Sequence, residues 1–403
     1  MLSGASLVLP DRVLSPGTLV IEDGRIAEIR SDTPSGGHTA FAFHGHYIVP
    51  GFIDVHLHGV DGVDALDSLA GEGAVAAIAA RLPRYGVTAF CPTTMACGPE
   101  ALRDVLDQVR RARETPVARS ARVLPAHLES NFINPEYNGA QPVACLRSPL
   151  AAFAAGTAGG AGREFSAADI LAEIARATPD VGIVTIASEL DGGLDLVRWL
   201  SARGHRVSLG HSGATYEEAL AAIDAGARRA THLFNRMAPL GHRAPGLVGA
   251  VLQTDEVAAE IICDGVHVHP ALIRTAIAAK RTSRIVAITD ATAASGLPVG
   301  STAMLGGRPI TAGERTARLP DGTIAGSVLT MDGAFQTLIG QVGLSLVDAA
   351  TVCATTPARE LGLVGHGVLA PEAAADLVVL DANFSVVQTY VAGQLVYARG
   401  TIY

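Results

Sequence analysis

Residues 48–62, "IVPGFIDVHLHGVDG", lead from an apolar run directly into two histidines, His56 and His58, and then a glycine. Side chains two residues apart on a β-strand point to the same side, whereas neighbours point to opposite sides. Both imidazoles are therefore expected to face one way, with Leu57 turned outward. Such a pair at the end of a buried strand is typical of a site for a divalent metal ion.

The arrangement of an apolar run, a polar residue and an alanine-rich helical stretch repeats through residues 49–365. It favours parallel strands that are buried on both faces and connected by helices. Eight apolar runs predict a (β/α)₈ TIM-like barrel, in which functional side chains lie at the C-terminal ends of the strands. The runs are "YIVPGFIDVHLH", "VTAFCPTT", "ARVLPAHLES", "VGIVTIASE", "HRVSLGHS", "RRATHLFN", "AAEIICDGVH" and "SRIVAITDA". A doubly wound open sheet is the alternative, but "HLHGVDGVDAL" does not match its phosphate-binding turn, GxGxxG.

The two ends of the chain have a different pattern, with short strand-like runs separated by turn signals such as Pro16-Gly17 and Asp23-Gly24. Neither end has enough strands to be stable by itself, because an isolated hairpin is marginal in water. We therefore expect residues 1–48 and 366–403 to pair into one small β-sandwich domain, with the catalytic barrel, residues 49–365, inserted between them.

The composition indicates which kinds of binding partner and which cellular compartment to expect. The 403 residues carry a formal net charge of −9, which argues against a nucleic-acid-binding surface. No apolar run approaches the roughly 20 residues that span a bilayer, and the start lacks the basic residues of a signal peptide. Five cysteines form no CxxC pair, as expected in a reducing compartment. We expect a cytoplasmic protein without membrane or nucleic-acid partners.

Metal-ligating residue types recur where the apolar runs end. Because the strands of a barrel converge at this end, imidazoles and carboxylates from different runs are expected to meet and to bind zinc, iron(II) or a similar divalent ion. Asp290 ends the run "IVAITD" and is predicted to accept a proton from water and to return it to a leaving amine. The residues at the run ends are His56, His58, Glu129, Glu189, His211, His232, Asp264, His267 and Asp290. Of these, Glu189 is expected to have only an orienting or structural role.

Several longer motifs of the sequence resemble those of a known protein family. "PGFIDVHLHG", "HLESNF", "GHSGATYEEA", "ATHLFNRMAPLGHRAPGLVGA", "IICDGVHVHP", "ITDATAASGLP", "DGTIAGSVLTMD" and "ADLVVLD" are similar to stretches of the amidohydrolase superfamily, and more closely of its N-acetylglucosamine-6-phosphate deacetylase branch. The resemblance implies the same barrel and terminal β-sandwich. It also implies hydrolysis of the N-acetyl group of an amino-sugar 6-phosphate, a small-molecule substrate, to acetate and a free amine.

The resemblance also implies roles for individual residues. Glu129, His211 and His232 match the ligands of the main metal, and His56 and His58 match a pair that supports a second ion in some members, so one or two ions are expected. Arg243 and His267 match phosphate contacts that are shared across a homodimer interface. Lys280, the one lysine of the chain, lies in a predicted helix, and Glu129 is the better candidate for a bridging ligand. The matched sugar-binding positions are Ala140, Gln141, Asn235, Arg236, Ile324, Ala325 and Gly326.

Four residues depart from the branch. Ser130 and Asn131 replace Gly-Pro, Gln141 replaces a histidine that polarises the acetyl carbonyl, and Arg236 replaces an alanine. The glutamine can still donate a hydrogen bond to an oxyanion, but it carries no charge. The expected substrate is N-acetylglucosamine 6-phosphate, and the alternatives are N-acetylgalactosamine 6-phosphate or a non-phosphorylated N-acyl compound. A non-catalytic sugar-phosphate sensor is disfavoured, because a sensor needs no proton-transferring Asp290.

Overall fold

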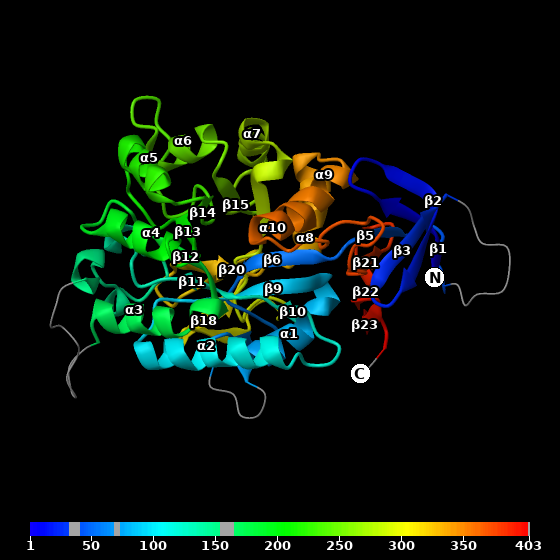
Figure 1. The fold of residues 1–403 in the computed structure, drawn as a ribbon, viewed down its shortest axis with the longest axis horizontal. Helices are drawn as coiled ribbons and strands as arrows, with labels where there is room; N and C mark the ends of the chain where they lie inside the picture. The colour runs from blue at the N-terminus through cyan, green and yellow to red at the C-terminus, as the bar shows by residue number, and fades with distance from the viewer. Residues whose placement is uncertain (32–40, 68–72, 154–164, 402–403) are drawn as a thin grey trace.

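The computed structural model describes residues 1–31, 41–67, 73–153 and 165–401. Figure 1 shows a barrel of strands surrounded by helices, with a smaller β-sheet at one end to which strands near both ends of the chain contribute. None of the helices in these ranges combines the length and the apolarity that crossing a bilayer requires.

The barrel consists of parallel strands, each of which comes from one of the predicted apolar runs. Every residue of most of these strands is buried, as expected for strands covered by helices outside and filled by side chains inside. The strands in order are β6 (Phe52–Leu57), β9 (Val87–Thr94), β11 (Ala126–Glu129), β12 (Val181–Ile186), β13 (Arg206–Leu209), β14 (Arg229–Ala230), β15 (Ala258–Ile262) and β16 (Ile285–Ile288), with the short β10 (Arg122–Val123) leading into β11.

The barrel closes between its first and last strands. The backbone N–H of Asp290 donates to the carbonyl of His56 at 2.9 Å, and Leu57 and Ala291 form a parallel bridge. Closure confirms the (β/α)₈ prediction and excludes the doubly wound open sheet.

Helices on the outside cover the strands with their apolar sides. In α2 (Pro99–Glu114), Leu102, Val105, Leu106 and Val109 are buried at the three- and four-residue spacing of an amphipathic helix. The start of α5 (Tyr216–Ala225) is fixed by a capping box in which Thr215 and Glu218 each bind the other's backbone N–H. The remaining helices are α1 (Ala74–Arg81), α3 (Ala167–Arg176), α4 (Gly193–Ser201), α6 (Gly246–Gln253), α7 (Pro270–Lys280), α8 (Met331–Thr337), α9 (Leu346–Ala350) and α10 (Thr356–Leu361).

The small domain is one hydrogen-bonded sheet built from both ends of the chain, as predicted. In it β5 (Tyr47–Pro50) pairs in parallel with β1 and antiparallel with β21, with Val49 opposite Val378. The sheet encloses a core of its own that includes Leu7, Leu19 and Leu377. The sheet order is β23 (Gln394–Ala398), β22 (Val386–Val391), β21 (Leu377–Leu380), β5, β1 (Leu2–Val8), β2 (Val13–Glu22) and β3 (Arg25–Arg30), with β4 (Phe41–Ala42) beside β1. The limits at 48/49 and 365/366 stay predictions.

A four-stranded antiparallel sheet between β16 and α8 was not predicted. It contains β17 (Thr302–Leu305), β18 (Arg308–Ala312), β19 (Thr316–Arg318) and β20 (Ile324–Ser327). The N–H of Ser327 donates to the carbonyl of Asp290 at 2.8 Å, which holds β20 against the end of β16. The signal for this insertion was Gly306-Gly307 between two short alternating runs, a typical hairpin turn.

Candidate active site

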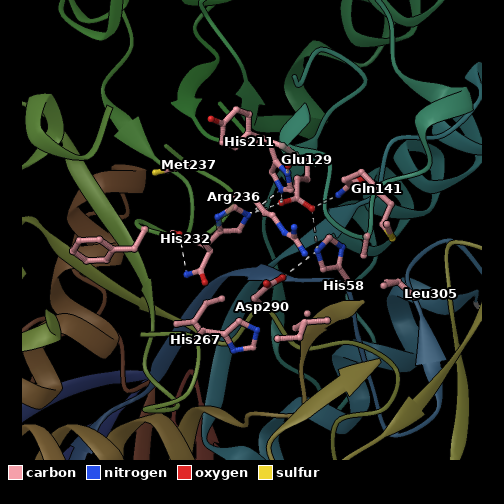
Figure 2. A pocket seen from close by; sticks show the side chains of 18 of the residues that line it. His58, Glu129, Gln141, His211, His232, Arg236, Met237, His267, Asp290 and Leu305 are labelled. Carbon is pink, nitrogen blue, oxygen red and sulfur yellow. Dashed lines mark hydrogen bonds and ion pairs between the residues drawn. The ribbon is translucent and has the colours of Figure 1, made fainter. Parts of the chain in front are cut away.

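A cavity of about 490 Å³ opens at the C-terminal ends of the barrel strands, and most of the predicted site residues line it (Figure 2). His56 lies beneath the cavity and is fully buried, Ala325 is buried in the core of the β17–β20 sheet, and Arg243 is exposed in the loop before α6. Sequence reasoning did not name Met95, Glu136, Tyr137, Phe234 or Leu305, which also line it. The predicted residues on the cavity wall are His58, Glu129, Ala140, Gln141, His211, His232, Asn235, Arg236, His267, Asp290, Ile324 and Gly326.

Glu129, His211 and His232 converge at the main candidate metal site. Oε1 of Glu129 lies 2.8 Å from Nε2 of His211 and 2.9 Å from Nε2 of His232, and the two nitrogens lie 3.1 Å apart. Nδ1 of His211 is 2.7 Å from the Tyr137 carbonyl, which only accepts, so this nitrogen donates there and Nε2 is the nitrogen that faces Glu129. Two imidazole nitrogens and a carboxylate oxygen, all buried, suit a divalent ion.

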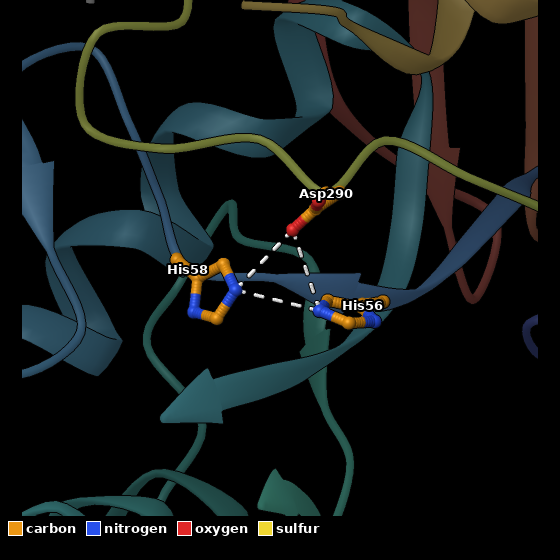
Figure 3. A group of neighbouring side chains, drawn as sticks. All are labelled: His56, His58 and Asp290. Carbon is orange, nitrogen blue, oxygen red and sulfur yellow. Dashed lines mark hydrogen bonds and ion pairs between the residues drawn. The ribbon is translucent and has the colours of Figure 1, made fainter. Parts of the chain in front are cut away.

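His56, His58 and Asp290 form a second cluster beside the first (Figure 3). Oδ1 of Asp290 lies 3.4 Å from Nε2 of His56 and 3.3 Å from Nε2 of His58. Oε2 of Glu129 lies 3.4 Å from Nε2 of His58, while its Oε1 faces the first cluster. Glu129 therefore lies between the clusters, with Oε1 beside His211 and Oε2 toward His58, and could contribute a ligand oxygen to an ion in either.

The protonation equilibria of these groups are shifted by burial and by one another. Burial opposes a charge on His58, but its contacts with Asp290 and Glu129 prevail and raise its pKa to about 10. Burial would raise the pKa of Asp290, but His56 and His58 lower it below its ordinary value of 3.8. The pKa of Glu129 is likewise far below its usual range, because burial is outweighed by His211, His232 and His58. The site keeps its carboxylates ionised and attracts positive charge.

Glu260 is a buried carboxylate beside the candidate metal ligand His56 that sequence reasoning did not name. Its Oε2 lies 3.2 Å from Nδ1 of His56, and its Oε1 accepts from Nη2 of Arg229 at 3.1 Å, with all three side chains buried. Burial raises the pKa of Glu260, but His127, His56 and Arg229 lower it to about 2. The ionised carboxylate therefore binds the Nδ1 proton of His56 and leaves Nε2 free for a metal. The sequence feature that could have revealed Glu260 is a glutamate inside the apolar run "VAAEIICD", where only a paired carboxylate is tolerated.

Three of the four residues that depart from the branch, Ser130, Asn131 and Gln141, do not share one role in the structure. Oγ of Ser130 donates to the Thr185 carbonyl at 2.6 Å, and Nδ2 of Asn131 donates to the carbonyls of Cys97 and Cys145 at 2.8 and 2.7 Å. Both side chains are buried and fasten the loop after β11, and neither lines the cavity. Gln141 does line it: its Oε1 accepts from the N–H of Ala96 at 2.8 Å, and its Nε2 donates to Glu129.

The two residues predicted to contact the phosphate, His267 and Arg243, do not meet at the cavity within one chain. His267 lines the cavity and is held by Asp264, whose Oδ2 lies 2.6 Å from Nδ1 of the ring, whereas Arg243 is exposed and does not reach the wall. Glu189 holds the loop after β13 by accepting from Ser212 Oγ and from the N–H of Gly213, both at 2.7 Å. Lys280 ends α7 outside the cavity and donates to the Thr254 carbonyl.

Comparison with known proteins agrees with this geometry. The amidohydrolase family model matches residues 197–396. The N-acetylglucosamine-6-phosphate deacetylase of Rattus norvegicus is 36% identical to this chain, over 98% of the chain and 94% of the relative. The chain belongs to the amidohydrolase family. Members of the family are hydrolases that typically depend on a divalent metal, and the clusters around Glu129 fit such an ion.

Two further members of the family widen the comparison. The N-acetylgalactosamine-6-phosphate deacetylase of Escherichia coli O157:H7 is 34% identical over 86% of this amidohydrolase and 87% of the relative. A solved structure of N-acetyl-D-glucosamine-6-phosphate deacetylase from Mycobacterium smegmatis, in complex with N-acetyl-D-glucosamine-6-phosphate, has a TM-score of 0.86 at 31% identity. The match covers 98% of this chain and 99% of the Mycobacterium smegmatis chain.

Proposed function

We propose that this amidohydrolase removes the N-acetyl group from N-acetylglucosamine 6-phosphate and gives glucosamine 6-phosphate and acetate. The observation that carries the proposal is the pair of imidazole–carboxylate clusters that meet at Glu129, beneath a cavity with room for a small molecule. Relatives named for this reaction, similar over nearly the whole chain, support the choice of substrate.

The proposed cofactor is zinc or iron(II), with one or two ions in each subunit. Glu129, His211 and His232 would hold the main ion, and His56 and His58, with Glu129 as the bridge, would hold a second. A divalent ion at this position supplies Lewis acidity and lowers the pKa of water.

Asp290 is the proposed general base and then general acid. Its carboxylate is on the cavity wall and ionised, so it accepts a proton from the attacking water and returns it to the amine nitrogen as the C–N bond breaks. The second N–H of Gln141 donates to the acyl oxygen, because the carboxamide is fixed by Ala96 and Glu129. The apolar side chains of Met95 and Leu305 cover part of the same wall and exclude water.

His267 of this chain and Arg243 of the partner subunit are proposed to bind the phosphate together. The functional unit is then a homodimer. The exposed position of Arg243, outside the cavity of its own chain, supports a role across an interface. We also propose that the protein is cytoplasmic, as its cysteine usage leads us to expect. N-acetylgalactosamine 6-phosphate is a second candidate substrate, because Gln141 and Arg236 differ from the usual pattern and one relative carries that name.

Acetate release from N-acetylglucosamine 6-phosphate by metal-loaded protein tests the proposal, with the galacto epimer and unphosphorylated N-acetylglucosamine in parallel. The gluco phosphate is expected to have the highest kcat/KM. Preference for the epimer would keep the reaction and change the sugar. No acetate from any of the three would refute the deacetylase assignment.

A further inference from the structure

Arg236 is a cation on the wall of the cavity. It projects from the loop that follows β14, the loop that also carries the metal-ligand candidate His232 (Figure 2). Among the described residues that line this cavity it is the one arginine or lysine, whereas Glu129, Glu136 and Asp290 contribute three carboxylates.

Among the described residues, no carboxylate lies within ion-pair distance of the Arg236 guanidinium, and none accepts a hydrogen bond from it. Several other arginines of this protein are paired with a carboxylate, for example Arg122 with Asp376 at 3.1 Å. Arginine carries five N–H donors in a planar fork and stays charged, so an unpaired guanidinium on a cavity wall is available to an anion.

The stem of Arg236 is held in place by the opposite loop. A β-carbon at Gly139 would lie 2.7 Å from Nε of Arg236 and 3.3 Å from its Cγ, so the side chain packs where Gly139 has none. The backbone of Arg236 is also fixed: it adopts a left-handed conformation, with φ of 51°, and its carbonyl accepts from the N–H of Ser212 at 3.0 Å. A restrained stem loses less conformational entropy when the guanidinium binds a ligand.

The position of the loop indicates which part of the substrate meets the guanidinium. β14 and β15 are neighbours in the barrel, and their loops bring Arg236 and His267 to the same cavity. An anion between these two side chains would contact the planar guanidinium and the imidazole held by Asp264.

We propose that the guanidinium of Arg236 binds the phosphate of the amino-sugar substrate from the same subunit that supplies the metal ligands. Phosphate recognition then does not depend wholly on Arg243 of a second subunit. This inference rests on the proposed function and identifies a specificity-determining residue at the same site. A bidentate Arg–phosphate pair also provides the local attraction that a chain with a net charge of −9 needs for an anionic substrate.

Calorimetric binding of glucosamine 6-phosphate to metal-loaded Arg236→Gln tests the proposal without turnover. Binding is expected to weaken roughly 10- to 100-fold, the range of a charge-assisted hydrogen bond. Arg236→Lys is expected to recover part of the loss, since lysine keeps the charge but not the fork. Arg12→Gln, which removes an exposed cation from the small domain, is the matched control for net charge. Thermal melting of each variant checks the fold.

Kinetics separate the phosphate from other parts of the substrate. Arg236→Gln is expected to raise KM for N-acetylglucosamine 6-phosphate more than it lowers kcat, and to have a much smaller effect on the unphosphorylated sugar. Unchanged binding of glucosamine 6-phosphate, or an equal loss with both sugars, would overturn the proposal. If the wild-type protein releases no acetate, the proposed function fails, while the binding measurement still tests Arg236.

Discussion

The N–H of Asp290 donates to the carbonyl of His56 at 2.9 Å, and the carboxylate of the same aspartate lies 3.4 Å from the imidazole of the same histidine. One contact closes the barrel between β6 and β16, and the other brings the proposed proton carrier to the candidate metal ligands. The backbone contact survives substitution of the side chain, so chemistry and fold can be tested separately at this position.

Asp290→Asn is expected to lower kcat by roughly 10²- to 10⁴-fold, because asparagine cannot accept the proton of the attacking water. The protein should still fold, since the side chain keeps its shape and the backbone hydrogen bond remains. Acetate release and circular dichroism on the same sample measure both. Activity close to wild type would remove Asp290 from the mechanism and revive the alternative of a non-catalytic sensor.

Removal of metal is expected to destabilise the protein, because the buried carboxylates and imidazoles of the two clusters then lose the cation that they would hold together. An ion present at 100 times its dissociation constant stabilises the folded state by about 2.7 kcal/mol. Melting curves after chelation and after addition of zinc or iron(II) should therefore differ by several degrees, and His211→Ala should reduce the difference. Identical curves with and without metal would contradict the assigned site.

Glu260→Gln is expected to cost about 3–5 kcal/mol of unfolding free energy, since it leaves Arg229 buried without its carboxylate. It should also lower the metal content of the His56 side, because the amide holds the Nδ1 proton of His56 less strongly. Urea unfolding and mass spectrometry of bound metal check the two effects. Glu28→Gln, which alters an exposed pair with Arg30, is the control and should change neither. A variant with unchanged stability would show that Glu260 is dispensable.

Asp376 gives a prediction of pH dependence away from the metal. Burial raises its pKa, but His366, Arg122 and the N–H of Ala392 prevail and hold it below 3.8. Because the folded-state pKa is lowered, the stabilisation is present above 3.8 and is lost as pH falls through the folded value. Asp376→Asn should cost about 1–3 kcal/mol at pH 7, and the difference from wild type should shrink below pH 4. Urea titrations from pH 7 to pH 3 measure it, and a pH-independent difference would contradict the assignment.

The barrel and the convergence of its ligands were predictable because both depend on local patterns. Fully buried strands produce apolar runs, and a polar residue at the end of each run marks the same end of the barrel. This is why Glu129, His211 and His232 could be expected to meet. The pairing of both termini into one sheet followed from their shared strand-like pattern and from the instability of either end alone.

Other features depend on contacts that no local pattern contains. Glu260 lies within a strand, not at its end, and its role is visible only when Arg229 and His56 lie on either side of it. Ser130 and Asn131 follow a ligand in sequence, yet their side chains turn away from the cavity, because each finds carbonyl groups of other segments. The carboxamide of Gln141 is held by Ala96, 45 positions earlier in the chain.

The register of β5 with β21 constrains how the chain matures on the ribosome. Val49 is synthesised 329 positions before its partner Val378, an interval of roughly 15 to 65 s at ordinary translation rates. During that time β1 can already cover one edge of β5, through the pairs Ser6–Tyr47 and Leu7–Ile48, while the other edge remains open. The segment that leads into the paired histidines is therefore a nascent edge strand, and strand exchange between neighbouring ribosomes is the expected misfolding route.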